Sequence, residues 1–271
     1  MKRISALFEK KPTRVLNIYC TAGYPLLDST LQVLKALQEN GADMVELGIP
    51  YSDPIADGSV IQMSNTKALQ NGMTIPKLFN QLKGFRKSSS LGGLPAGQAG
   101  VGEAMPVILM GYLNPVLQYG FEKFCCDAAE MGIDGLILPD LPEFEYEKHY
   151  KAIVEKNKLD FIFLVTPETS AERVKKLDEL SSGFLYAVSS SSTTGLSKNQ
   201  IDITQYLQKL KSLKLKNPIL AGFGIGDKDR FEKVCVHANG AIIGSAYIKA
   251  LENVEDVNAA TRTFLSSILP V

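Results

Sequence analysis

The chain has 271 residues, 45% of them apolar, which is enough for one α/β barrel of roughly 250 residues or for two smaller domains. Acidic and basic side chains balance at 29 each, so the basic excess of a nucleic-acid-binding protein is absent, and an anionic substrate has to be held by local groups. The four cysteines lack C-x-x-C spacing, which predicts no structural disulfide, and two histidines are too few for a histidine-rich metal site. The sequence has no apolar signal core near the start and no apolar run of ~18 residues, so we expect a cytoplasmic, soluble protein without a membrane span.

Short β-branched runs alternate along the chain with longer runs whose apolar residues recur at the helical period. The first expected strand covers residues 15–20. The helix after it begins at Asp28 or Ser29, either of which can cap its first turn, and it ends before Gly41. Further strands are expected at residues 42–48, 106–111, 134–139, 160–165, 184–189, 218–224 and 240–245, and further helices at about 59–70, 74–85, 121–132, 143–157, 170–182, 202–214, 228–238 and 254–269.

This alternation gives eight strands, each followed by a helix. The strands are nearly continuously apolar, as parallel strands are when helices cover both faces of a sheet. Eight such units favour a closed (β/α)8 TIM barrel, an α/β fold, over an open doubly wound sheet. The first loop, TAGYP, also lacks the G-x-G-x-x-G of a dinucleotide-binding sheet. A single barrel domain is expected, with an extra N-terminal helix, ISALFEK, across its floor and a short helix after the eighth strand.

Residues 87–104 interrupt the alternation, because they are rich in Ser, Gly, Ala and Pro and show no periodicity. They fall between a helix and the third strand, on the bottom face of the barrel, whereas catalytic loops lie on the opposite face. We therefore interpret this segment as a flexible insertion without a catalytic role.

Two carboxyl groups belong to the second strand and the loop after it, where a barrel concentrates its chemistry. Alternation places Glu46 on the same side of the strand as Met44. If that side faces the barrel interior, burial raises the pKa of Glu46 and suits it to proton transfer near neutral pH; if it faces outward, Glu46 pairs with a helix. Asp57 closes the segment VELGIPYSDPIADG and is either a site residue or the cap of the following helix.

Glycine-bearing turns follow the seventh and eighth strands, in AGFGIGDKD and GAIIGSAYIK. TIM barrels often bind phosphate at these two loops, where backbone N–H groups and the start of a short helix face the anion. Gly224, Gly244 and Ser245 are therefore a candidate phosphate site, although glycine also ends strands for steric reasons. The polar loop at 189–199 has the length of a lid that closes over a substrate. The sequence contains no G-x-S-x-G nucleophile elbow.

The segment VELGIPYSDPIADG closely resembles the signature of the tryptophan synthase alpha chain family. TAGYP, LMGYLNP, LILPDLP, VTPETSAER, AGFGI and GAIIGSA extend the resemblance over nearly the whole chain in the family's order. The resemblance implies a lyase that splits indole-3-glycerol phosphate into indole and glyceraldehyde 3-phosphate by a retro-aldol step, with no metal or organic cofactor. It implies that Glu46 is the acid–base residue and that Asp57 binds the indole N–H.

The same resemblance assigns the rest of the substrate site. It implies a lid threonine at Thr194, and a lid stretch at 190–193 that lacks the Arg of the best-known members. Tyr19 and Tyr51 stand where Phe is common in the family. The substrate-binding residues implied are Tyr186 beside the two carboxyl groups, Tyr19, Leu109 and Phe223 around the indole, and Gly224, Gly244 and Ser245 at the phosphate.

A partner is implied as well: a pyridoxal-phosphate beta chain that takes up the indole, in an alpha2beta2 heterotetramer. Residues 53–58 and the segments near Asn114 and Pro142 are expected to face that partner. Two alternatives stay open, namely another phosphate-binding barrel isomerase or synthase, and a catalytically weak allosteric partner of the beta chain. The presence of both Glu46 and Asp57 favours the enzyme.

Overall fold

Strands and helices alternate along the chain as the hydrophobic pattern predicts. The computed structural model describes residues 2–86, 104–188, 203–222 and 224–269. Its strands are β1 (Val15–Thr21), β2 (Met44–Gly48), β3 (Val107–Met110), β4 (Gly135–Ile137), β5 (Asp160–Phe161), β6 (Leu164–Val165), β7 (Leu185–Val188), β8 (Ile219–Gly222) and β9 (Gly240–Ile243). Its helices are α1 (Arg3–Lys10), α2 (Ser29–Glu39), α3 (Ser59–Gln70), α4 (Ile75–Leu82), α6 (Leu113–Tyr119), α7 (Phe121–Glu130), α8 (Glu143–Glu145), the π-helical turn η1 (Tyr146–Tyr150), α9 (Lys151–Lys156), α10 (Ala171–Leu180), α11 (Ile203–Ser212), α12 (Lys228–Cys235), α13 (Ser245–Ala250) and α14 (Val257–Ile268).

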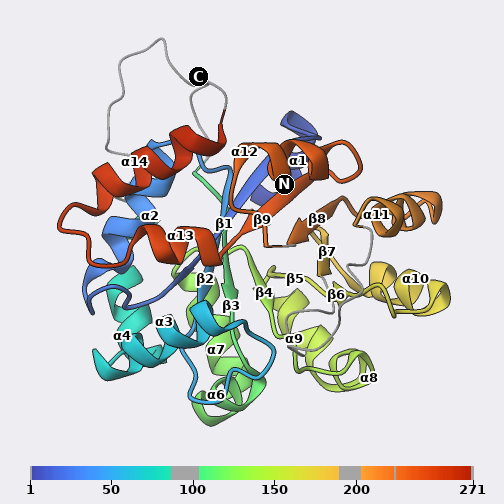
Figure 1. Cartoon of the computed structure of the whole chain (residues 1–271). Helices are drawn as coiled ribbons and strands as arrows, with labels where there is room; N and C mark the ends of the chain where they lie inside the picture. The colour runs from blue at the N-terminus through green and yellow to red at the C-terminus, as the bar shows by residue number, and fades with distance from the viewer. Residues whose placement is uncertain (1, 87–103, 189–202, 223, 270–271) are drawn as a thin grey trace.

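The described strands form one parallel sheet that closes on itself. Their order is β5-β4-β3-β2-β1-β9-β8-β7-β6, and each neighbouring pair is parallel. The two end strands, β5 and β6, are consecutive in the chain, so the sheet returns to its starting point. Figure 1 shows the strands gathered in the centre with helices around them. The expected parallel TIM barrel is confirmed.

The stretch at 160–165, expected as one strand, is divided between its two neighbours. Its first half, β5, pairs with β4, and its second half, β6, pairs with β7. Backbone bonds continue through the gap: the Ile162 N–H donates to Leu136 O, and the Tyr186 N–H donates to the Phe163 carbonyl, both at 3.0 Å. A tilted strand in a closed barrel is staggered against its neighbours in this way, which explains why one hydrophobic run becomes two short strands.

Two helical features differ from the pattern. α6 follows β3 almost directly and ends at Gly120, whose φ of 94° terminates the helix. At seven residues it is too short to give a clear helical period. The helix expected over 143–157 is present, but its middle turn is the π-helical segment η1. Nearer the N-terminus, α2 begins at Ser29, and the preceding Asp28 makes no side-chain cap bond.

Alternate residues of the strands fill the barrel interior. Met44, Ile108 and Ile242 belong to an interior cluster that is separate from the larger apolar layer between the sheet and the helices. Ile4 and Phe8 of α1 join that interior cluster. Helix α1 therefore covers the floor of the barrel, as expected for the extra N-terminal helix.

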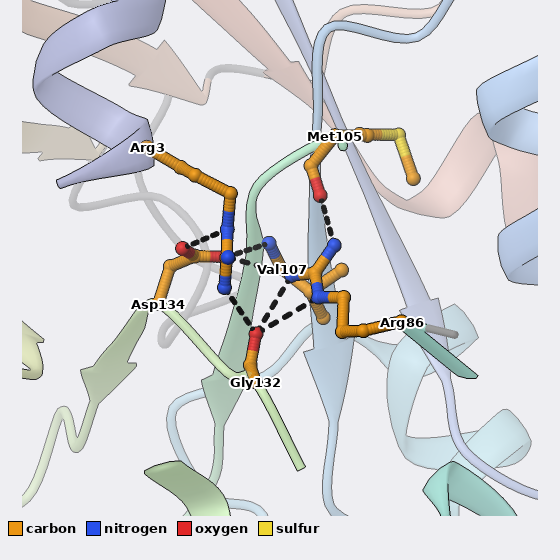
Figure 2. Close-up of polar contacts among 6 residues, drawn as sticks. All are labelled: Arg3, Arg86, Met105, Val107, Gly132 and Asp134. Atoms are coloured by element: carbon orange, nitrogen blue, oxygen red, sulfur yellow. Dashed lines mark hydrogen bonds and ion pairs between the residues drawn. The ribbon is translucent and has the colours of Figure 1, made fainter. Parts of the chain in front are cut away.

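A partly buried ion-pair network fixes α1 to the strands on this floor (Figure 2). Asp134 accepts from Arg3 Nε at 2.6 Å and from Arg86 Nη2 at 2.8 Å, and both guanidinium groups also donate to the Gly132 carbonyl. The Asp134 carboxylate is buried and has to be paired to offset the cost of its desolvation, so the bond from Arg3 favours this position of α1.

The same network borders the segment expected to be a flexible insertion. Arg86 immediately precedes residues 87–103, which lie outside the described residues, and its Nη1 donates to the carbonyl of Met105 just after them at 2.8 Å. Both flanks of this segment are therefore held together at the N-terminal ends of the strands. Within the described parts of the chain, no helix is long and apolar enough to cross a membrane.

Candidate active site

A cavity of about 1130 Å³ lies at the C-terminal ends of the barrel strands. Interior positions of the strands and the loops that follow them contribute its walls, as the fold requires of an active site. Asp57 lies in the wall after β2, Tyr186 in the wall from β7, and Gly244 in the turn after β9. The cavity therefore joins residues that are far apart in the chain.

Glu46 is fully enclosed inside the barrel, with 0% of its surface exposed. It is two residues beyond Met44, which belongs to the interior cluster, so both side chains point inward. Asn17 Nδ2 on β1 donates to Glu46 Oε1 at 2.7 Å. Burial raises the pKa of Glu46 to about 8, although the bond from Asn17 acts in the opposite direction. The interpretation of Glu46 as an outward-facing partner of a helix is wrong.

Two tyrosine rings lie over interior glycines near this carboxyl group. A Cβ atom at Gly48 would collide with the Tyr19 hydroxyl, and one at Gly222 would lie 2.7 Å from the Tyr186 hydroxyl. Gly48 is the next interior position after Glu46 on β2, so the Tyr19 ring occupies the space between Glu46 and the cavity mouth. Glycine at 48 and 222 is thus required by the rings beside it. Burial raises the pKa of both hydroxyls well above the usual range, which keeps them neutral.

Asp57 lines the cavity and does not cap a helix. The capping position of α3 belongs to Gly58, and no side chain makes a cap bond there. Asp57 instead accepts hydrogen bonds from Tyr112 and from Asn65 Nδ2, the latter at 3.4 Å. Burial raises the pKa of Asp57 to about 6, against the effect of these two bonds. The two carboxyl groups therefore titrate in different ranges because their surroundings differ.

The turns after β8 and β9 form another part of the same cavity. Gly224, Gly244 and Ser245 all line it. Gly224 has a φ of 63°, a conformation that glycine adopts without strain. Ser245 begins α13, so its backbone N–H is free of a partner within the helix, and Lys249 on the same helix also lines the cavity. This arrangement of donors suits an anionic group.

One residue assigned to the indole pocket points elsewhere. Leu109 belongs to the apolar layer between the sheet and the helices, and the cavity is lined by its neighbour Met110. Successive side chains of a strand face opposite sides of a sheet, so only one of the two can face the barrel interior. The expected placement of Leu109 in the pocket is therefore wrong, and Met110 lines the cavity in its place. Thr194, the rest of the loop at 189–199, and Phe223 lie outside the described residues.

Three polar residues of the site were not among the predicted residues. Asn17 and Asn65 each donate to one of the two carboxyl groups, and Tyr112 contacts Asp57 while its hydroxyl accepts from the Ala56 N–H at 3.0 Å. For Asn17 a signal exists, because it is an amide inside the otherwise apolar run VLNIYC. Among the described residues, no group of three or more His, Cys, Asp or Glu side chains is arranged to hold a metal ion.

Comparison with known proteins agrees with this site. Residues 6–267 match the family model of the tryptophan synthase alpha chain. The chain is similar to the tryptophan synthase alpha chains of Parabacteroides distasonis, at 46% identity over 93% of both chains, and Flavobacterium johnsoniae, at 47% identity over 93% of this chain and 94% of the relative.

Solved structures give the same result. The tryptophan synthase alpha chain of Legionella pneumophila superposes with a TM-score of 0.84 at 34% identity, covering 99% of this chain and 96% of that one. A tryptophan synthase structure from Mycobacterium tuberculosis gives a TM-score of 0.82 at 29% identity, with 98% of both chains covered.

Proposed function

The chain belongs to the tryptophan synthase alpha chain family, lyases of tryptophan biosynthesis, and on that premise we propose that it cleaves indole-3-glycerol phosphate into indole and glyceraldehyde 3-phosphate. The observation that carries this proposal is the pair of carboxyl groups, Glu46 fully buried with a pKa of about 8 and Asp57 partly buried with a pKa of about 6. Near neutral pH the first is mostly protonated and the second mostly ionised. A site that holds the pKa values of two carboxyl groups apart in this way has a proton donor and an anion available at the same pH.

The retro-aldol step needs one group that both gives and takes a proton. Protonation of indole carbon 3 by Glu46 produces a positively charged indolenine. The Glu46 carboxylate then takes the proton of the side-chain hydroxyl, a C=O bond forms, and the carbon–carbon bond breaks with its electron pair returning to the ring. Glu46 ends as it began, protonated, and no net proton is consumed. A pKa near the working pH is what such a residue requires.

Asp57 has a different role in this scheme. In its ionised form it accepts the indole N–H and stabilises the positive charge that develops on the ring nitrogen. The turns at Gly224 and Gly244 bind the phosphate away from the reacting carbon and anchor the substrate. Because Glu46 is fully enclosed and the Tyr19 ring lies over Gly48, contact with the substrate requires a change of rotamer at Glu46 or Tyr19.

The test is to incubate the purified chain with indole-3-glycerol phosphate and to measure indole and glyceraldehyde 3-phosphate separately. We expect both products in equal amounts, and a higher rate when a tryptophan synthase beta chain is added. Consumption of the substrate without indole would favour another phosphate-binding barrel enzyme. No indole from the folded chain, even with an active beta chain, would favour the role of an allosteric partner.

We also propose that the face around residues 53–58 binds the beta chain. Ile55 there is 80% exposed, and Leu117 of α6 and Phe144 of α8 are 45% and 62% exposed. α6 is connected to its neighbours, because the Leu113 N–H donates to Asp140, and Asn114 Nδ2 lies 3.5 Å from the hydroxyl of Tyr51. Figure 1 shows the loop before α3, α6 and α8 along the same lower side of the barrel. Exposed apolar side chains gathered on one face are typical of an interaction surface.

Substitution on this face is expected to weaken activation by the beta chain. In Leu117→Ser and Phe144→Ser, the chain alone should release indole at its normal rate, while the beta-chain concentration needed for half-maximal activation should rise roughly tenfold. Ile55 is left intact because it belongs to the loop of Asp57. Val236→Ser is the matched control, since Val236 is 66% exposed at the end of α12, and Figure 1 shows α12 on the opposite side of the barrel from α6 and α8. An equal effect of all three substitutions would contradict the proposed interface.

A further inference from the structure

Asn17 is an amide in a place where the fold favours apolar side chains. It lies on β1 between Val15 and Tyr19 on the interior face, opposite Met44 of β2, and it is 0% exposed. A buried amide destabilises the fold unless its groups are hydrogen-bonded. Its Oδ1 atom has no hydrogen-bond partner among the described residues, and its Nδ2 atom bonds to Glu46. Barrel stability therefore does not explain an Asn at this position.

The bond to Asn17 distinguishes the two oxygen atoms of Glu46. Oε1 accepts from Asn17 Nδ2 at 2.7 Å, whereas Oε2 is buried without a partner in the described part of the chain. A carboxylic acid carries its proton on one oxygen, and an oxygen that already accepts an N–H is the poorer place for it. The proton of the neutral acid therefore belongs on Oε2, which is the atom left free to exchange it.

We propose that Asn17 is a positioning residue for Glu46, holding the carboxyl group through Oε1 so that Oε2 carries the transferred proton. The inference rests on the proposed function in taking Glu46 as the acid–base group. It adds a residue that touches neither the substrate cavity nor the reacting atoms and that acts through Glu46 alone.

The surroundings of Glu46 make the effect of Asn17 measurable. The titratable groups that interact with Glu46 are Tyr19 and Cys20 on β1 and Tyr186 on β7. Burial raises the pKa of all three, so they stay neutral over the range in which Glu46 titrates. Burial and the Asn17 bond are the two influences that set the pKa of Glu46. If the Asn17 bond is removed, burial alone acts on the pKa of Glu46, and this pKa rises.

The experiment compares wild type with Asn17→Leu, which keeps the shape and removes the donor, and with Asn17→Asp, which also adds a charge. The Glu46 carboxyl is titrated directly by NMR in chains labelled with ¹³C at glutamate, with its signal assigned from Glu46→Gln. The pH dependence of kcat/KM for indole release is measured in parallel. Thr261→Val is the matched control, because Thr261 is a fully buried polar residue that bonds to Tyr247 on the outer side of the sheet.

We expect the Glu46 midpoint to rise by about one pH unit in Asn17→Leu and further in Asn17→Asp, since a hydrogen bond to the charged form is lost. The alkaline limb of kcat/KM should move by the same amount, and the acidic limb assigned to Asp57 should stay in place. A midpoint unchanged in Asn17→Leu, or moved equally by Thr261→Val, overturns the proposal; Asn17→Leu decides the matter even if Asn17→Asp does not fold. If wild type releases no indole while the midpoint still moves, the proposed function fails and the coupling of Asn17 to Glu46 stands.

Discussion

Glu46→Gln is expected to lower kcat for indole release by a factor of 10² to 10⁴, the range typical of a lost general acid–base group. Glutamine has nearly the same shape and can still accept from Asn17 Nδ2 through its own Oε1. It has no proton to give to indole carbon 3 and cannot take one from the side-chain hydroxyl. KM should change little, because Glu46 is enclosed behind Tyr19, and the turns at Gly224 and Gly244 that we propose to bind the phosphate form another part of the cavity wall. Steady-state kinetics near neutral pH measure both constants.

The control for this substitution is Glu147→Gln, the same chemical change on the outer surface. Glu147 pairs with Lys176 at 2.8 Å and has almost half of its side chain exposed, so its loss should leave kcat unchanged. Indole release by Glu46→Gln at the wild-type rate would keep the lyase and remove Glu46 from its mechanism. A rise in KM with kcat unchanged would mean that Glu46 only binds the substrate.

The parallel barrel could be predicted because its strands are nearly continuous apolar runs separated by helical periods. Because the strands are nearly continuously apolar, the sequence does not show which of their residues face the barrel interior. In PVILMG every side chain is apolar, so nothing in the sequence distinguishes Leu109, which packs against the helices, from Met110, which lines the cavity. When both faces of a strand are buried, hydrophobic alternation carries no information about direction.

The sequence indicates which side chains of a strand face the barrel interior only where the strand departs from the apolar pattern. Asn17, Glu46, Gly48 and Gly222 all occupy interior positions, and each is polar or lacks a side chain because of a neighbour inside the barrel. A single such residue does not fix the direction, and this is why Glu46 alone left two interpretations open. Asn17 and Glu46 together indicate the interior face of their strands. The register pairs Asn17 with Met44, two residues before Glu46, so the two polar side chains lie on the same side of the sheet.

Contacts between loops could not be predicted from the sequence, for a different reason. Asp57 was expected either at the site or at the start of a helix, and the choice depends on Tyr112, which is distant in the chain and reaches it from the loop after the neighbouring strand β3. The division of residues 160–165 into two strands depends likewise on the stagger of the closed barrel. Both are properties of the closed sheet and not of any one segment.

Glu46→Gln is also expected to stabilise the fold at alkaline pH. The folded chain binds the Glu46 proton more tightly than the unfolded chain, since burial raises the pKa from the ordinary 4.5 to about 8. The proton stabilises the fold fully below about pH 4.5, and this contribution is lost progressively as the pH rises through about 8. Over this interval the wild type loses up to about 5 kcal/mol relative to a chain with a neutral side chain at position 46.

Urea denaturation of both proteins between about pH 5 and pH 9 measures this difference directly. Asp57 contributes with the same sign at lower pH, because its pKa is also raised, but it is present in both proteins and cancels in the comparison. The two free energies of unfolding should nearly coincide at the acidic end, and the advantage of Glu46→Gln should grow with pH to several kcal/mol. Glu147→Gln should stay within about 0.5 kcal/mol of wild type throughout, as expected for an exposed pair. A difference between Glu46→Gln and wild type that does not depend on pH would show that Glu46 titrates near its ordinary pKa, and the acid–base role built on its burial would then lose its physical basis.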